Sequence, residues 1–183
     1  AKPVMWSPVE KTALAEAEIE YHDHTSTTIH VRFPIKDASR AELEGAAVVI
    51  WTTTPWTLPS NLALAVGPDL EYAVMADSDG TRYILGSATV ETYAKQLADA
   101  EQVGTIRGAD LLGRTYVPLF PYFADMTEVD PQKAHHGTER AFQVLAGDFI
   151  DTAEGTGVVH MAPGFGEDDQ RVVGEAGIGM VVP

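Results

Sequence analysis

Apolar residues in this sequence fall mostly in short runs that are bounded by glycine, proline and small polar residues. Such runs, when rich in β-branched and aromatic side chains, are typical of strands rather than of long amphipathic helices. Between two of the runs, Asp77-Ser78-Asp79-Gly80 has the composition of a hairpin turn. We predict strands at 27–34, 47–53, 62–66, 72–76, 82–85, 103–107, 140–145 and 157–161.

The N-terminal part carries two further patterns. Ser7, Pro8 and Glu10 resemble a helix start, with a capping serine, a proline at the first helical position and a glutamate three residues after the cap. We therefore expect a short helix there. Residues 15–21 alternate apolar and acidic side chains, which predicts a strand although alanine and glutamate favour helices.

Two helices are expected later in the chain. One spans 167–175 and is entered through a glycine-rich turn. Ser87 can cap another helix, which would run to about Ala100. Its buried stripe would consist of apolar residues at helical spacing, namely Val90, Tyr93, Ala94 and Leu97.

Many short strands with few helices predict a β-rich α+β domain, in which a barrel-like core of short strands carries peripheral helices. We expect one domain over residues 1–183, with an exposed loop at 131–138. Of the 183 residues, 45% are hydrophobic and 21% are charged, as in folded domains. A chain of this length buries about 70% of the surface that its unfolded form exposes, so its core needs no disulfide or metal.

The sequence contains no cysteine, which excludes thiol catalysis, disulfides and thiolate zinc sites. No apolar run approaches the roughly 20 residues of a membrane span, and the first residues lack the features of a secretion signal. We therefore expect no membrane contact and a cytoplasmic location. The formal net charge is −15, and the 12 Lys and Arg are scattered. Such a field repels a polyanion, so any contact with nucleic acid must be local.

One candidate site is the peptide WTTTPWTLPSN at 51–61, which ends an apolar run with hydroxyl side chains, two prolines and an amide. Proline restricts the backbone, so these hydroxyls would be held in place and could orient a water or contact a ribose. A plain structural alternative is a strand end whose threonines bond their own backbone.

A second candidate is GTGVVHMAPGFGEDD at 155–169, where a histidine ends an apolar run and two aspartates open a helix. This order can direct an imidazole and a carboxylate into one cleft. A carboxylate at a helix start is stabilised as an anion, so Asp169 could receive a ligand's ammonium group. The structural alternative is that Asp168 or Asp169 caps the helix and that His160 belongs to the core.

Other patterns give little support for chemistry. His22 and His24 would share a strand face, and His135 and His136 lie in the expected loop, but neither pair brings the further ligands of a metal site. We predict no metal. The Gly155-Thr156-Gly157 segment fits neither the dinucleotide nor the P-loop spacing, and no Gly-x-Ser-x-Gly motif is present.

The two candidate segments together resemble the editing domain of isoleucyl-tRNA synthetase, the connective-peptide insertion of this class I aminoacyl-tRNA synthetase, which the valyl and leucyl enzymes also contain. The likeness extends to the N-terminal KPVMWS and ALAEAEIEY and leaves only about 100–143 weakly diagnostic. The valyl and leucyl enzymes have Thr-Thr-Arg-Pro-Glu/Asp where this chain has Thr-Thr-Thr-Pro-Trp, which favours the isoleucyl member. The motif GFGEDD resembles that of the eukaryote-like branch.

Neither His-Ile-Gly-His nor Lys-Met-Ser-Lys-Ser occurs, so the chain resembles an insertion excised from a larger synthetase.

The resemblance implies hydrolytic proofreading of mischarged valyl-tRNA(Ile), with valyl-adenylate as a second candidate substrate. It implies no cofactor in this domain. Its implied partners are the aminoacylated 3′ end of the tRNA, through the valine moiety and the terminal adenosine, and the catalytic domain of the parent synthetase. We assume a monomer. By the same resemblance Asp169 binds the α-ammonium, while Thr54, helped by Thr53 and His160, positions the attacking water.

The remaining site residues also come from the resemblance. Thr52 and Asn61 would contact the adenosine end or support the loop. His160 and Trp56 would bound the pocket that admits the side chain of valine and refuses that of isoleucine. Two alternatives stay open: a non-catalytic module that docks the tRNA acceptor end, and an editing domain for a different amino acid, as in the valyl enzyme.

Overall fold

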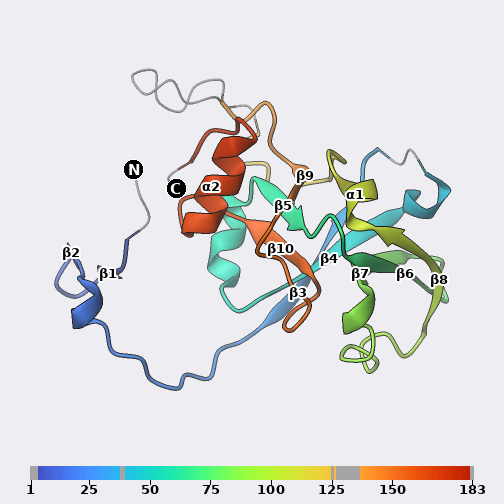
Figure 1. The fold of residues 1–183 in the computed structure, drawn as a ribbon, viewed down its shortest axis with the longest axis horizontal. Helices are drawn as coiled ribbons and strands as arrows, with labels where there is room; N and C mark the ends of the chain where they lie inside the picture. The colour runs from blue at the N-terminus through green and yellow to red at the C-terminus, as the bar shows by residue number, and fades with distance from the viewer. Residues whose placement is uncertain (1–3, 38–39, 125, 127–136, 182–183) are drawn as a thin grey trace.

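The computed structural model describes residues 4–37, 40–124, 126 and 137–181. In this part of the chain the strands form sheets of two, three and five strands, with helical segments around them (Figure 1). The helices are α1 (Gly108–Leu111) and α2 (Glu167–Glu175), and the 3₁₀ helices are η1 (Glu16–Glu18), η2 (Ala41–Leu43), η3 (Pro55–Ser60) and η4 (Ser87–Thr89). The strands are β1 (Trp6–Ser7), β2 (Thr12–Ala13), β3 (Ile29–Pro34), β4 (Ala46–Thr52), β5 (Ala63–Val66), β6 (Glu71–Asp77), β7 (Arg82–Gly86), β8 (Ala100–Arg107), β9 (Gln143–Ala146) and β10 (Val158–Met161).

The five-stranded sheet has the order β3-β4-β7-β6-β8. β4 and β7 run parallel, and the other neighbours are antiparallel. β4 is the apolar run AAVVIWT, and all of its residues except Val49 and Trp51 are buried, because the strand lies inside the sheet between β3 and β7. The turn predicted between β6 and β7 is confirmed: Gly80 has a φ of +79°, and the Asp77 carboxylate accepts hydrogen bonds from the backbone N–H groups of Asp79 and Thr81.

The three-stranded sheet has the order β10-β5-β9 and lies between two apolar clusters. All four residues of β5 are buried. Leu64 and Val66 point into the first cluster, whereas Ala63 and Ala65 point into the second, which lies under α2. The alternation of a strand thus supplies both clusters from one short segment.

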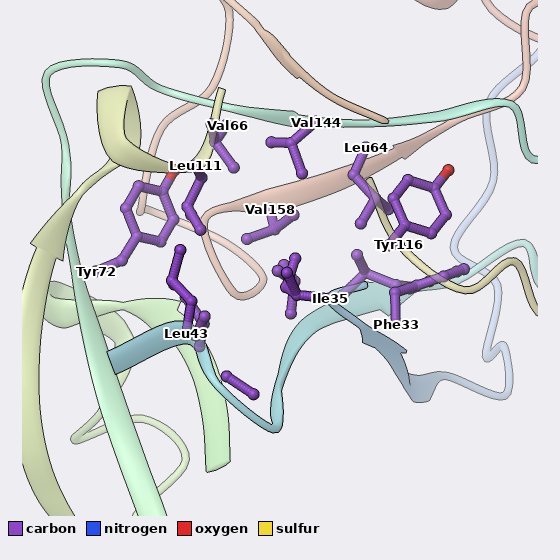
Figure 2. Packing of buried hydrophobic residues seen from close by; sticks show 14 of the residues in the cluster. Phe33, Ile35, Leu43, Leu64, Val66, Tyr72, Leu111, Tyr116, Val144 and Val158 are labelled. Atoms are coloured by element: carbon purple, nitrogen blue, oxygen red, sulfur yellow. The ribbon is translucent and has the colours of Figure 1, made fainter. Parts of the chain in front are cut away.

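The first cluster joins the two larger sheets and contains Phe33, Leu64, Tyr116, Val144 and Val158, among others (Figure 2). The ring of Tyr116 is in edge contact with that of Phe33, at 5.2 Å between centroids. Burial of this apolar surface is the main source of stability for a chain without disulfides. The segment before β10 is also attached to the five-stranded sheet, because the Thr156 hydroxyl donates to the Val49 carbonyl at 2.7 Å.

The predicted strand-rich α+β class is confirmed, and the strands at 27–34, 47–53, 62–66, 72–76, 82–85, 103–107, 140–145 and 157–161 appear with bounds shifted by a few residues. The helix at 167–175 is confirmed at its predicted bounds. The barrel-like core is corrected in one respect: within the described residues the strands form separate sheets and do not close into a barrel. None of the described helices is both long and apolar enough to cross a membrane.

The two N-terminal predictions are wrong. Ser7 and Glu10 do make the contacts of a helix start, including a bond from the Glu10 N–H to the Ser7 hydroxyl at 3.2 Å. Lys11, however, has a φ of +55°, so the chain reverses and β1 pairs with β2. Residues 15–21 form η1 and irregular chain rather than a strand, because no strand of the described part lies beside them to pair with.

The helix expected from Ser87 to Ala100 is wrong in kind. After η4 the chain continues as successive turns, in which the Tyr93 N–H bonds to the Val90 carbonyl at 3.1 Å. Neighbouring β-branched residues in this segment disfavour an α-helix. Its apolar side chains nevertheless pack on the sheet as the spacing predicts, namely Val90, Tyr93 and Leu97, while Ala94 is exposed. The loop expected at 131–138 lies mostly outside the described residues.

We predict that Tyr116→Phe lowers the free energy of unfolding by about 1–3 kcal/mol. Tyr116 is fully buried, burial raises the pKa of its hydroxyl well above the ordinary value, and the hydroxyl donates to Asn61 Oδ1 at 2.6 Å. The substitution leaves that amide oxygen buried without its donor. Denaturant unfolding measures the change. Tyr122→Phe, at a side chain that is 68% exposed, is the control and should be neutral. Equal losses in both variants would contradict the prediction.

Candidate active site

A cavity of about 380 Å³ lies where the end of β4 and η3 meet the end of β10 and the start of α2. It is lined by residues from both segments that the sequence singles out, and its volume is in the range of small-molecule sites. The lining residues are Trp51, Thr52, Thr54, Trp56, Thr57, Val159, His160, Ala162, Phe165, Gly166 and Asp169.

The pairing of β5 with β10 brings the two segments together. β5 follows η3 almost directly, and in the antiparallel register His160 lies opposite Leu64. The chain that enters β5 is therefore carried past the end of β10. A direct contact joins the two segments: Thr57 Oγ1 lies 2.8 Å from His160 Nε2.

The threonine peptide is held by its own hydrogen bonds. The Thr54 N–H donates to the Thr52 hydroxyl at 3.0 Å, and the Thr57 hydroxyl donates to the Thr54 carbonyl at 2.9 Å. Pro55 begins η3 and Pro59 lies within it, which restricts the backbone further. The structural alternative is thus partly correct, since some hydroxyls bond to the local backbone. Thr54 remains exposed to the cavity.

His160 is a neutral and largely buried imidazole. Burial lowers its pKa from 6.5 to about 4, so the ring carries no charge at pH 7. A neutral imidazole has one N–H donor and one acceptor nitrogen. Because the single proton of the Thr57 hydroxyl is donated to Thr54, the hydroxyl oxygen accepts from Nε2–H of His160. Nδ1 is then the acceptor nitrogen, and it has no hydrogen-bond partner among the described residues.

Asp169 supplies the carboxylate of the cavity. It is the third residue of α2, where the helix dipole favours an anion, and its Oδ2 accepts the Ala162 N–H at 2.7 Å. Burial raises the pKa of the carboxyl above its ordinary value, and the neighbouring charge of Asp168 adds to that rise. Asp168 itself is exposed, pairs with Arg171 at 3.3 Å and does not line the cavity. Gly166, not an aspartate, is the cap of the helix.

Comparison with known proteins identifies the group to which the chain is related. No family model matches it. It is 43% identical over its whole length to the isoleucine–tRNA ligase of Bacillus licheniformis, of which it spans 18%, and 44% identical to that of Symbiobacterium thermophilum, with the same shares. Over its whole length the chain matches a segment of the isoleucine–tRNA ligases. The expected eukaryote-like branch stays a prediction.

Solved structures give the fold of this ligase segment. The crystal structure of GlLeuRS-CP1 is similar to the segment with a TM-score of 0.63 and 18% identity. The match covers 81% of the segment and 60% of the GlLeuRS-CP1 chain. The editing domain of the cytosolic leucyl-tRNA synthetase of P. knowlesi is similar with a TM-score of 0.58 and 12% identity. This match covers 78% of the segment and 59% of the P. knowlesi chain. At such identities the likeness shows the fold alone. The isoleucine–tRNA ligase segment therefore has the fold of a synthetase editing domain.

Five of the predicted site residues line the cavity of the ligase segment, namely Thr52, Thr54, Trp56, His160 and Asp169. Thr53 lies in an adjoining hollow of about 220 Å³, which shares some lining residues with the cavity. Asn61 is buried away from both: its amide group donates to the Ala63 carbonyl at 2.8 Å and accepts from Tyr116. The structure thus gives Asn61 a supporting place and no surface in the cavity.

Thr57 and Phe165 lie in the two candidate peptides, but the sequence alone assigns neither of them a role. Thr57 is almost fully buried and bonds to His160, whereas Phe165 is 49% exposed at the rim. The position of Thr57 three residues after Thr54 in a proline-bounded peptide was a signal for the first, because a 3₁₀ turn brings i and i+3 together. Nothing in the sequence pointed to the rim position of Phe165.

The described part of the ligase segment holds no cluster of three or more His, Asp or Glu residues suited to a metal. His22 and His24 lie in exposed irregular chain instead of on a strand, and His22 approaches Glu20 at 3.5 Å. The pair His135 and His136 lies outside the described residues.

We predict that His160→Gln reduces the loss of stability on acidification by about 3 kcal/mol between pH 7 and pH 4. The pKa of His160 is lowered from 6.5 to about 4, so between these pH values the ring is protonated in the unfolded chain and neutral in the folded chain. The stability that the neutral ring contributes is present above pH 6.5 and is lost as the pH falls towards 4. Asp169 titrates in both proteins, so its effect cancels. Denaturant unfolding across this range tests the difference, with His22→Gln as the exposed control. Parallel curves for wild type and His160→Gln would contradict it.

Proposed function

We propose that this chain is the hydrolytic editing domain of an isoleucyl-tRNA synthetase, and that it cleaves the ester joining valine to the terminal adenosine of tRNA(Ile). The observation that carries the proposal is one cavity that combines an uncharged imidazole, threonine hydroxyls and a half-buried carboxylate. The family of the chain and its editing-domain fold support it. The chain spans only 18% of the relatives that it matches, so aminoacylation belongs to the rest of the parent protein.

The need for a second site follows from the size of the substrates. A pocket that selects isoleucine rejects valine by only about 1–3 kcal/mol, as is known for isoleucyl-tRNA synthetases, because the two differ by one methylene. A cavity that excludes the larger side chain discriminates in the opposite sense. We assign that exclusion to His160 and Trp56, which both line the cavity. The hydrogen bond from Nε2–H of His160 to the Thr57 hydroxyl fixes the ring, so this side of the cavity does not yield to the extra methylene.

Asp169 orients the substrate. An aminoacyl ester carries an α-ammonium group, and an ionised carboxylate at the edge of the cavity is its natural partner. The backbone N–H of Ala162 holds one carboxylate oxygen, which leaves the other for the ligand. Because burial raises the pKa of Asp169, this contact weakens as acid protonates the carboxyl.

Hydrolysis then requires a placed water rather than a covalent nucleophile. The ester is already reactive, so positioning supplies much of the acceleration. We assign the water to Thr54 in the cavity, helped by Thr53 from the adjoining hollow and by the neutral ring of His160. Thr52 supports the peptide through its bond to the Thr54 N–H, and Asn61 supports it through Tyr116.

The finer parts of the proposal concern partners and place. The substrate contact is local, at the aminoacylated 3′ end with its valine moiety and terminal adenosine, because the net charge of −15 disfavours broad phosphate contact. Valyl-adenylate is a second candidate substrate. The catalytic domain of the parent synthetase is the covalent partner, the location is cytoplasmic, and the chain acts as a monomer over residues 1–183.

Asp169→Asn should lower kcat/KM for hydrolysis of valyl-tRNA(Ile) about 100-fold, because the ammonium then meets a neutral amide in a half-buried site. The amide keeps the size of the carboxylate, so the fold should be retained. Release of radiolabelled valine by the purified chain is the measurement. Asp168→Asn removes the charge next to it on the same helix, outside the cavity, and should leave the rate near that of wild type. If wild-type chain releases no valine, the docking-module alternative holds instead.

His160→Ala should enlarge the cavity and raise hydrolysis of isoleucyl-tRNA(Ile) about tenfold relative to valyl-tRNA(Ile), since one methylene is worth about 1–3 kcal/mol. Deacylation of valyl, threonyl and isoleucyl esters under one set of conditions measures the selectivity, and preference for the threonyl ester would favour editing of a different amino acid. His24→Ala, in exposed chain and outside the cavity lining, is the control. Unchanged discrimination in His160→Ala would assign the sieve to other residues.

A further inference from the structure

A second hollow of about 440 Å³ lies on the face of the five-stranded sheet that points away from the first apolar cluster. We call it the outer hollow. Val49 and Leu85 form its floor, and the turn segment after η4 forms one wall. Its aromatic and polar lining includes His30, Arg32, Tyr83, Tyr93 and Thr156.

The outer hollow lies beside the editing cavity along β3 and β4. Ile29 and Val31 pack against the first cluster, so His30 and Arg32 project from the other face of β3. In the register of the sheet His30 lies opposite Trp51, which lines the cavity, and Arg32 lies opposite Val49. Two residues along a strand advance only about 7 Å.

The small hollow of Thr53 fills the interval between the two sites. It shares Thr156 with the outer hollow and shares Trp51, Thr52 and Val159 with the cavity. The cavity, the small hollow and the outer hollow are therefore neighbours along β4, and a ligand whose terminal group occupies the cavity would reach the outer hollow with its next unit. The distance between the two sites suits adjacent nucleotides of a single strand.

The chemistry of the outer hollow suits a flat heteroaromatic ring. The rings of His30 and Tyr93 are in edge-to-face contact at 4.9 Å between centroids, which fixes the orientation of Tyr93 in the hollow. No described residue forms a hydrogen bond with the Tyr93 hydroxyl. Aromatic rings of this kind bind nucleobases by stacking.

The charges favour the base over the phosphate. The guanidinium of Arg32 lies over the ring of Tyr83, at 5.7 Å from its centroid, and can donate to a base carbonyl. Asp77 and Asp99 also line the hollow, so the single cation does not make it a phosphate site. An acidic protein that recognises the end of a nucleic acid needs such local, uncharged contacts.

We propose that the outer hollow binds the base of the nucleotide that precedes the terminal adenosine of the aminoacylated tRNA, with Tyr93 stacking on it and Arg32 donating to its carbonyl. The inference rests on the proposed function and extends it by one nucleotide. That nucleotide is a cytidine, whose base offers a carbonyl acceptor to the guanidinium. The outer hollow thereby aligns the strand before the ester enters the cavity.

The test compares two small esters: valyl-adenosine, and cytidylyl-adenosine valylated at the same terminal ribose. We expect wild-type chain to prefer the dinucleotide about tenfold in kcat/KM, the size of effect that base stacking provides. Arg32→Ala and Tyr93→Leu should abolish the preference and leave hydrolysis of valyl-adenosine unchanged. Tyr93→Leu keeps apolar packing on the sheet, and thermal unfolding checks that both variants are folded. Lys95→Ala, on the same turn segment but outside the hollow lining, should keep the preference.

The outcomes separate this inference from the proposed function. If wild type hydrolyses both esters with equal kcat/KM, or if the variants keep the preference, proofreading stands and this inference is overturned. If wild type hydrolyses neither ester, the proposed function fails and the inference fails with it. An equal loss on both esters in Arg32→Ala would place the effect in the editing cavity and overturn the assignment of the outer hollow. If the outer hollow instead contacts the rest of the synthetase, Arg32→Ala or Tyr93→Leu would weaken that association and leave hydrolysis of both esters unchanged. This result would also overturn the inference.

Discussion

The pairing of β5 with β10 is the constraint on which the site depends. It joins segments that are about a hundred residues apart, and its register places His160 opposite Leu64 while Met161 enters the cluster under α2. A slip of one residue would exchange the faces of those two side chains and bury the imidazole among apolar residues. Thr57 then fixes the ring from the other segment through the 2.8 Å contact. The cavity is therefore a product of sheet register, completed by one side-chain bond.

Electrostatics and burial act together at this site. The net charge of −15 disfavours broad contact with a phosphate backbone, so the proposed recognition of the tRNA depends on a few side chains at its 3′ end. In the cavity, burial keeps His160 neutral and makes an ionised Asp169 less favourable until it meets a cation. In the function we propose, such a site holds an ammonium ester in a fixed orientation and adds no basic group that would attract polyanions generally.

Much of the fold could be predicted from the sequence because its strands are bounded apolar runs and α2 follows a glycine-rich turn. The failures have physical reasons. Residues 15–21 alternate like a strand, but a strand forms only where a partner supplies hydrogen bonds, and the sequence does not show partners. Asn61 belongs to a buried network with Tyr116, 55 positions away, and the bond between Thr57 and His160 spans 103 positions. Local patterns identify the peptides of the site, but tertiary register decides which hydroxyls face the ligand.

The central claim is that the two peptides form one cavity that fits a valyl group and rejects an isoleucyl group. Titration of the chain with a non-hydrolysable amide of valyl-adenosine, followed by NMR, tests it most directly. The account predicts that the largest shifts fall on His160, Asp169 and the backbone of Thr54, and that the isoleucyl amide produces none of them at equal concentration. Shifts that gather elsewhere on the molecule, or that are the same for both amides, would contradict it.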